Sequence, residues 1–107
     1  MQRTNEATMV HEMMVALCVT DEALYRQYRE AMTPLLAAHG GGFRYDFTVA
    51  EVLRSDSAHP INRVFTIHFA ARAQTDAFFA HPEYLAIRKR WFEGSTGGVT
   101  LVGAWDR

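Results

Sequence analysis

His68 is the residue whose type and position best suit acid–base chemistry. A neutral imidazole takes up and releases protons near pH 7. Residues 63–70 alternate as a strand does, so His68 shares one face with Thr66. The opposite face carries Phe65, Ile67 and Phe69. If that aromatic face packs on helices, His68 faces away from them and is our candidate catalytic base. The alternative is a structural histidine held by a neighbouring hydroxyl or carboxylate, which is the commoner role.

Residues on several predicted strands are candidates for binding a substrate beside His68. Arg44 and Asp46 alternate along the predicted strand 43–53, so we expect them to share a face and to orient a substrate or His68. The alternative is a solvated ion pair that protects an edge strand from pairing. Aromatic residues in the strands could wall a pocket, although most such residues only pack. The candidate substrate-binding residues are Thr66, Arg44, Asp46, Tyr45 and Trp105.

Several kinds of site are not predicted. His11-Glu12 lacks the second histidine of a helical zinc motif, and no other pair has metal-ligand spacing, so we expect no metal. We also expect no cofactor, since the chain has no dinucleotide fingerprint, phosphate loop or nucleophile elbow. His39 and His81 are placed to cap helices. Cys18, the single cysteine, excludes an internal disulfide and suits a reducing cytoplasm.

The composition indicates one domain without a polyanionic partner. A chain of 107 residues is the size of one domain with a substantial core. Its formal net charge of −1 argues against nucleic acid and against an acidic membrane surface. The short basic run Arg88–Arg90 is expected on the solvent face of a helix. The apolar run Met13–Val19 is too short to span a bilayer, so we predict a cytoplasmic protein.

The chain reads as four strands and two helical regions after a loose tail, which we place at residues 1–10, with a single domain at 11–107. Asp21 is a predicted N-cap, and Pro34 predicts a kink or the start of a second helical piece. Arg29 is expected on the polar side of the first helix, and Trp91 on the sheet-facing side of the last. Glu51 interrupts the second strand, so we expect a bulge or an exposed strand end nearby. The predicted elements are strand 13–20, helix 21–39, strand 43–53, strand 63–70, helix 72–80, helix 82–93 and strand 99–105.

This β-α-β-β-α-β order limits the topology. Right-handed crossovers predict that the first and third strands are parallel neighbours at the centre, with the second and fourth at the edges. Both helical regions then cover one face of the sheet. The other face stays apolar and uncovered, which predicts a symmetric homodimer with two sheets face to face.

Short motifs in both halves of the chain carry a family resemblance. The first half has Asp21, Tyr25, Tyr28, Arg29, Pro34 and Ala38-His39-Gly40-Gly41. The second half has Glu51-Val52-Leu53, Arg63-Val64-Phe65, Ile67, Phe69, Ala77-Phe78-Phe79 and Pro82-Glu83-Tyr84 with Ala86 and Arg88. In this order, they resemble domain of unknown function 1330, of the dimeric α/β-barrel superfamily, over residues 12–103.

The resemblance implies an α+β, ferredoxin-like βαββαβ protomer. Its four-stranded antiparallel sheet has helices on one face, and two protomers enclose a lumen between their sheets. The superfamily it resembles includes cofactor-free monooxygenases, isomerases and cyclases, haem enzymes and ligand-sensing domains, so the fold alone does not assign a reaction. Our function hypothesis is a homodimer that binds a small organic molecule in the lumen, where His68 serves as the base in cofactor-free chemistry. The alternative is a non-catalytic ligand-binding or dimerisation domain.

Overall fold

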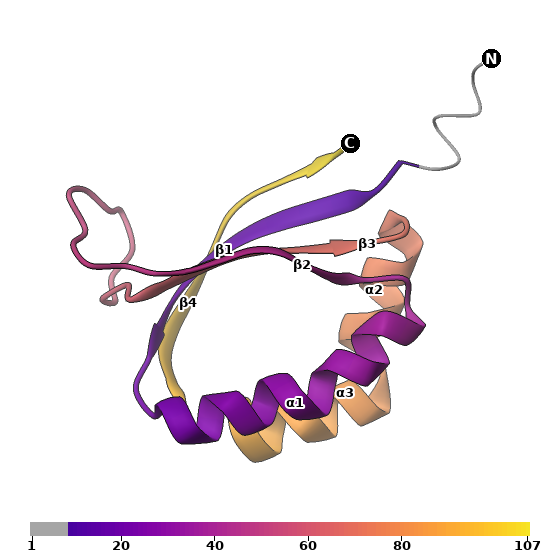
Figure 1. Ribbon diagram of the computed structural model, residues 1–107, viewed down its shortest axis with the longest axis horizontal. Coiled ribbons are helices and arrows are strands. Elements are labelled where there is room, and N and C mark those ends of the chain that lie inside the picture. Colours follow the sequence, from indigo (N-terminus) through magenta and orange to yellow (C-terminus); the bar gives the residue numbers. More distant parts are fainter. Residues whose placement is uncertain (1–8) are drawn as a thin grey trace.

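The computed structural model describes residues 9–107 of the chain. The tail expected at residues 1–10 therefore lies mostly outside the described residues. Within them, Val10 exchanges two backbone hydrogen bonds of 2.8 Å with Arg107. The first and last strands are thus joined at the end of the sheet where β1 begins and β4 ends (Figure 1).

The fold is α+β and ferredoxin-like in its element order. The elements are β1 (His11–Val19), α1 (Glu22–Ala38), β2 (Gly42–Thr48), β3 (Arg63–Phe69), α2 (Arg72–Ala80), α3 (Pro82–Ile87), the π-helical turn η2 (Arg88–Phe92) and β4 (Thr96–Asp106). The strand order is β2-β3-β1-β4, with the predicted second and fourth strands at the edges. Every pair is antiparallel, which confirms the antiparallel sheet. The expectation of a parallel central pair was wrong, because the hairpin after β2 reverses the chain before it pairs with β1.

The first helix begins and ends where the sequence predicts. The Asp21 carboxylate accepts a hydrogen bond from the Leu24 backbone N–H at 3.0 Å and so caps the free donors of the first turn. The helix then runs without interruption through Pro34, so no second helical piece begins there. It stops at Gly40, which has a φ of +69°, a left-handed conformation that costs glycine little.

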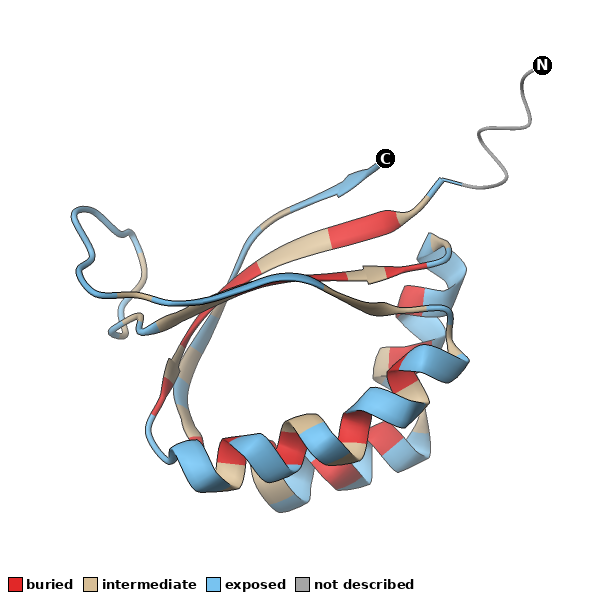
Figure 2. Cartoon of the chain, viewed as in Figure 1, coloured by how far each residue is buried: buried red, intermediate tan, exposed pale blue. Residues whose placement is uncertain are grey.

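One face of the sheet packs on the helices and forms the core. Figure 2 shows the buried residues on the two central strands and on the sides of the helices that face them. The aromatic residues of β3 lie on this face, as their alternation predicts, and so do the odd-numbered residues of β1. The core contains Val15, Leu17, Val19, Tyr25, Tyr28, Met32, Leu36, Phe65, Ile67, Phe69, Phe78, Tyr84, Ile87 and Phe92.

A register shift in β2 separates residues that we expected to share a face. Phe43 pairs with Ile67, but Tyr45 already pairs with Thr66, so Arg44 is an extra residue in this strand. Tyr45 therefore turns away from the helices, whereas Asp46, paired with Phe65, turns toward them. The predicted common face for Arg44 and Asp46 was wrong. β2 ends at Thr48, and its last residues are exposed, in line with the exposed strand end that was one of the two alternatives near Glu51.

The last helical region contains a π-helical turn that changes which side chains face the sheet. Tyr84 and Ile87 are buried, as predicted. After them η2 adds a residue to the turn, so Phe92 enters the core and Trp91 is left half-buried beside Ala31. Trp91 was expected to pack on the sheet as Tyr84 and Ile87 do; it packs against the edge of the core and is only partly buried. Within residues 9–107, none of the helices combines the length and the apolar character needed to cross a membrane.

Candidate functional site

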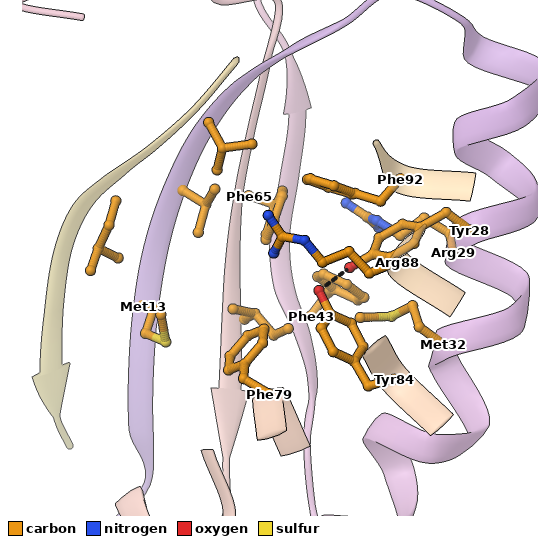
Figure 3. A pocket seen from close by; sticks show the side chains of 14 residues that line it. Met13, Tyr28, Arg29, Met32, Phe43, Phe65, Phe79, Tyr84, Arg88 and Phe92 are labelled. Carbon is orange, nitrogen blue, oxygen red and sulfur yellow. Dashed lines mark hydrogen bonds between the residues drawn. The ribbon is translucent and has the colours of Figure 1, made fainter. Parts of the chain in front are cut away.

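A cavity of about 160 Å³ lies between the sheet and the helices, and we call it the inner cavity (Figure 3). The strands contribute its apolar floor, with Met13, Val15, Phe43, Phe65, Ile67, Val99 and Leu101. The helices contribute both apolar and polar groups, from Tyr28, Arg29, Met32, Phe79, Tyr84, Arg88 and Phe92. A mostly apolar cavity with a few converging polar groups is the usual composition of a small-molecule site.

Two tyrosines form the neutral polar group of the inner cavity. The hydroxyls of Tyr28 and Tyr84 are 2.9 Å apart and hydrogen-bonded, and Figure 3 shows them meeting between the two helices. One hydroxyl donates to the other, so the proton of the accepting hydroxyl remains available to a bound molecule. Burial and then the neighbouring Tyr84 raise the pKa of Tyr28 well above its ordinary value. At neutral pH Tyr28 therefore keeps its proton, so the pair can donate a hydrogen bond to a bound molecule.

Arg29 supplies a buried positive charge. Its side chain is only 16% exposed, and its guanidinium carbon lies 3.9 Å from the ring centre of Phe43. Its Nε donates to the Tyr25 hydroxyl at 3.0 Å, and its Nη1 donates to Asp46 at 3.2 Å. Among residues 9–107, Nη2 of Arg29 is the buried side-chain nitrogen or oxygen without a hydrogen-bond partner. Two strong donor positions on a charged group are thus unused.

Asp46 holds Arg29 only weakly, because it is shared with Arg63. The Arg63 Nε and Nη2 donate to the two Asp46 oxygens at 2.8 and 3.0 Å, a bidentate pair. Burial favours the neutral acid, but the hydrogen bond from Arg63 and the charge of Arg29 outweigh it and lower the pKa of Asp46. The carboxylate is therefore ionised at neutral pH, and its tighter bonds go to Arg63.

The inner cavity opens beside β4. Val99 and Leu101 line it and are 46% and 55% exposed, so the helices do not cover this edge of the sheet. Arg88 also lines the cavity and is exposed, and Figure 3 shows its side chain extending from the helix toward the strands. The sequence predicted a purely solvent-facing basic run. Arg88 instead places a second cation at the opening.

The opposite side of the sheet, which we call the outer face, carries a buried carboxylate. Glu12 is completely buried there and accepts two hydrogen bonds from Arg44, at 2.9 and 3.0 Å, and one from Arg107. Burial opposes ionisation, but the hydrogen bonds from the two arginines outweigh it and lower the pKa of Glu12 to about 2. Glu12 is thus a structural anion whose charge is fully satisfied.

The outer face also carries His68, as the alternation in β3 predicts. His68 pairs with Glu12 across the sheet, and Thr66 pairs with Met14. Burial, then the positive charge of Arg107, lowers the pKa of His68 below its ordinary value, so the ring is neutral at pH 7. Tyr45 and Trp105 are on this face as well, from their pairing with Thr66 and Glu12. Asp46 alone among the candidate binding residues is on the helix side, where it accepts a hydrogen bond from Arg29.

The structure therefore divides the candidate residues between two sides of one sheet. The residues that line the inner cavity were predicted as core or solvent positions, and Arg29 was placed on the polar side of its helix. The sequence did contain a sign that Arg29 lies on the inner side of its helix. Tyr25 and Arg29 are four residues apart and therefore lie on one helix face. Within residues 9–107, no three histidine, cysteine or acidic side chains gather closely enough to hold a metal ion.

Comparisons with known proteins agree with this fold. A model of the family described as domain of unknown function (DUF1330) matches residues 13–105, which confirms the resemblance seen in the sequence. A comparison with curated protein sequences found no match.

Solved structures give the same architecture at low sequence identity, and this likeness shows the fold alone. A protein of unknown function from Rhodopseudomonas palustris has a TM-score of 0.76 at 13% identity, over 92% of this chain and 82% of that one. A dimeric ferredoxin-like protein of unknown function from Bacteroides fragilis has a TM-score of 0.58 at 15% identity, over 92% and 96%. The hydroxynitrile lyase of Passiflora edulis has a TM-score of 0.65 at 13% identity, over 94% of each chain.

Proposed function

The chain belongs to the DUF1330 family of domains of unknown function, and from its inner cavity we propose that it binds a small organic molecule between the sheet and the helices. The observation that carries the proposal is the cavity itself, about 160 Å³ with an apolar floor and converging tyrosine and arginine groups. An apolar cavity of about 150 Å³ accommodates benzene, so the ligand has an apolar body of about that size.

The polar groups of the cavity suit stabilisation of a developing negative charge. A hydroxyl of the Tyr28–Tyr84 pair and the unpaired Nη2 of Arg29 are preorganised donors at a mostly apolar cavity. We propose that any reaction there is cofactor-free and uses these donors to hold an oxygen of the substrate. The fold accommodates catalysis, since a hydroxynitrile lyase shares it.

We propose that the outer face is the interface of a homodimer. Among its exposed apolar side chains are Tyr45 and Phe47, which stack at a centroid distance of 5.9 Å and are 48% and 54% exposed. Trp105 adds a third aromatic side chain. A face of this kind supports association, and several structures of the same fold are described as dimeric.

A second candidate places the ligand between the two sheets of that dimer, beside His68. It is supported by the lowered pKa of His68, which keeps a neutral imidazole on the outer face near Arg44 and Thr66. A neutral imidazole is a competent base. The two candidates put the ligand on opposite sides of β3, so one pair of variants separates them.

Binding of benzamide, measured by ligand-observed NMR, tests the proposal. We expect a dissociation constant near 1 mM, about 0.5 kcal/mol per non-hydrogen atom, which is within the range for small ligands. Val15→Phe fills the inner cavity from β1, whereas Val64→Phe adds the same bulk on the outer face. The proposal predicts that Val15→Phe abolishes binding and that Val64→Phe does not.

The reverse result would move the site to the outer face, and His68→Ala would then be expected to weaken binding as well. If benzamide binds neither the wild type nor any variant, the proposed function is wrong. The variants must keep the wild-type circular dichroism spectrum for the comparison to hold.

Light scattering tests the dimer. We expect a two-protomer mass at micromolar concentration, because a monomer would leave the aromatic residues of the outer face in water. Phe47→Glu should reduce the mass to that of one protomer, while Leu85→Glu, at a 48% exposed position on α3, should not. A monomeric wild type would refute the proposed interface.

A further inference from the structure

The buried guanidinium of Arg29 carries an inference about the class of ligand, one that rests on the proposed function. Every other polar side-chain atom of comparable burial within residues 9–107 has a hydrogen-bond partner, but Nη2 of Arg29 has none. An unpaired buried donor is costly, and a charged donor more so. A ligand that supplies the missing acceptor is therefore the simplest explanation for the unpaired Nη2 of Arg29.

The surroundings of Arg29 show why its own chain does not supply that acceptor. Asp46 is the carboxylate in contact with Arg29, and both of its oxygens are already bound by Arg63 at 2.8 and 3.0 Å. The rings of Phe43 and Phe65 lie 3.9 and 4.9 Å from the guanidinium carbon, so aromatic groups occupy its faces. These contacts hold the guanidinium in place and leave Nη2 without a hydrogen-bond partner.

A second positive group lines the same cavity. Arg88 extends from η2 toward the strands, with its guanidinium carbon 5.0 Å from the ring centre of Phe92 (Figure 3). No acidic side chain is among the residues that line the inner cavity. The cavity wall itself therefore has two guanidinium groups and a tyrosine hydroxyl pair, which are donors, and no carboxylate; the carboxylate in contact with Arg29, Asp46, is shared with Arg63.

We infer that the natural ligand of the inner cavity is a small carboxylate: its anionic group binds Arg29 and Arg88, and its apolar body, about the size of a six-membered ring, packs among the phenylalanines of the floor. A planar carboxylate matches the fork of a guanidinium. An inorganic phosphate would fill the polar part of the cavity but leave the apolar floor in contact with water.

Benzoate and benzamide provide the test, because they share shape and size and differ in charge. At pH 7, we expect benzoate to bind the wild type about tenfold more tightly than benzamide, since only the carboxylate adds the attraction of opposite charges and a bidentate fit to the guanidinium. Inorganic phosphate should not displace benzoate at equal concentration.

Variants at the two arginines assign the preference. Arg29→Met should lower the benzoate-to-benzamide ratio at least threefold. Arg88→Gln should lower the ratio at least threefold. Because Arg88 is exposed, this variant should fold even if Arg29→Met does not. Arg90→Gln is the matched control, since Arg90 is also exposed on η2 and does not line the cavity; it should leave the ratio unchanged.

Three results would overturn the inference while leaving the proposed function intact: benzamide binding as tightly as benzoate, phosphate displacing benzoate, or Arg90→Gln lowering the ratio as much as Arg88→Gln. The last result would mean that general surface charge attracts benzoate. If neither compound binds, the proposed function fails, and the inference fails with it.

Discussion

The buried carboxylate on the outer face should make stability depend on pH in a way that one substitution removes. Glu12 has a pKa of about 2 in the folded protein, against an ordinary value of 4.5. A carboxyl with a lowered pKa stabilises the fold fully above its unfolded value, and the stabilisation is lost as pH falls toward the folded value. The shift corresponds to at most about 3.4 kcal/mol. Arg44 and Arg107 are 41% and 38% exposed, so solvent screening reduces the contribution to about 1.5 kcal/mol.

Urea unfolding at pH 7 and pH 3 measures this contribution. Between pH 7 and pH 3, the free energy of unfolding should fall by about 1 kcal/mol more for the wild type than for Glu12→Gln. At pH 3 the pH is already well below the unfolded pKa of 4.5, so most of the stabilisation by Glu12 is lost. At pH 7 Glu12→Gln should itself cost at least about 1.5 kcal/mol, since two arginines lose their shared anion. Glu51→Gln, at an exposed loop position, is the control and should behave as wild type. If the wild type and Glu12→Gln lose equal stability, Glu12 is not ionised as described.

Two further predictions concern packing. Phe92→Ala should lower the free energy of unfolding by about 3–5 kcal/mol in urea, because η2 turns Phe92 into the core. Trp91→Ala should lower it by less than about 2 kcal/mol, since Trp91 is only half-buried. Equal losses would contradict this packing. Gly98→Ala should cost about 1–3 kcal/mol, since a Cβ there would lie 2.3 Å from the His59 ring, whereas Gly97→Ala would meet a threonine methyl at 3.3 Å and should cost less. In a His59→Ala background the cost of Gly98→Ala should fall below 1 kcal/mol, and an unchanged cost would exclude His59 as the cause.

Much of the fold could be predicted because its signals are local. The alternation in β3 places large aromatic residues on one face, and that face packs on the helices. Asp21 and Gly40 mark the ends of α1 through their own backbone chemistry. The direction of the central strands was predicted wrongly, since it depends on how the hairpin after β2 returns, which alternation does not show.

The division of the site between two faces could not be predicted, because single residues decide it. One extra residue at Arg44 reverses every later side chain of β2, and nothing in the local composition marks it. A π-helical turn likewise exchanges Trp91 and Phe92. Arg29 was assigned to solvent by its charge, but its long side chain reaches the aromatic floor and buries its guanidinium there.

The position of a bound probe tests the central claim most directly. Methyl-labelled protein titrated with benzamide reports each face of the sheet separately, since Val15 and Ile67 line the inner cavity while Met14 and Val64 lie on the outer face. We predict that the methyl resonances of Val15 and Ile67 shift with benzamide concentration and that those of Met14 and Val64 stay in place. Shifts at Met14 and Val64 without shifts at Val15 and Ile67 would contradict the proposed site and place the ligand beside His68.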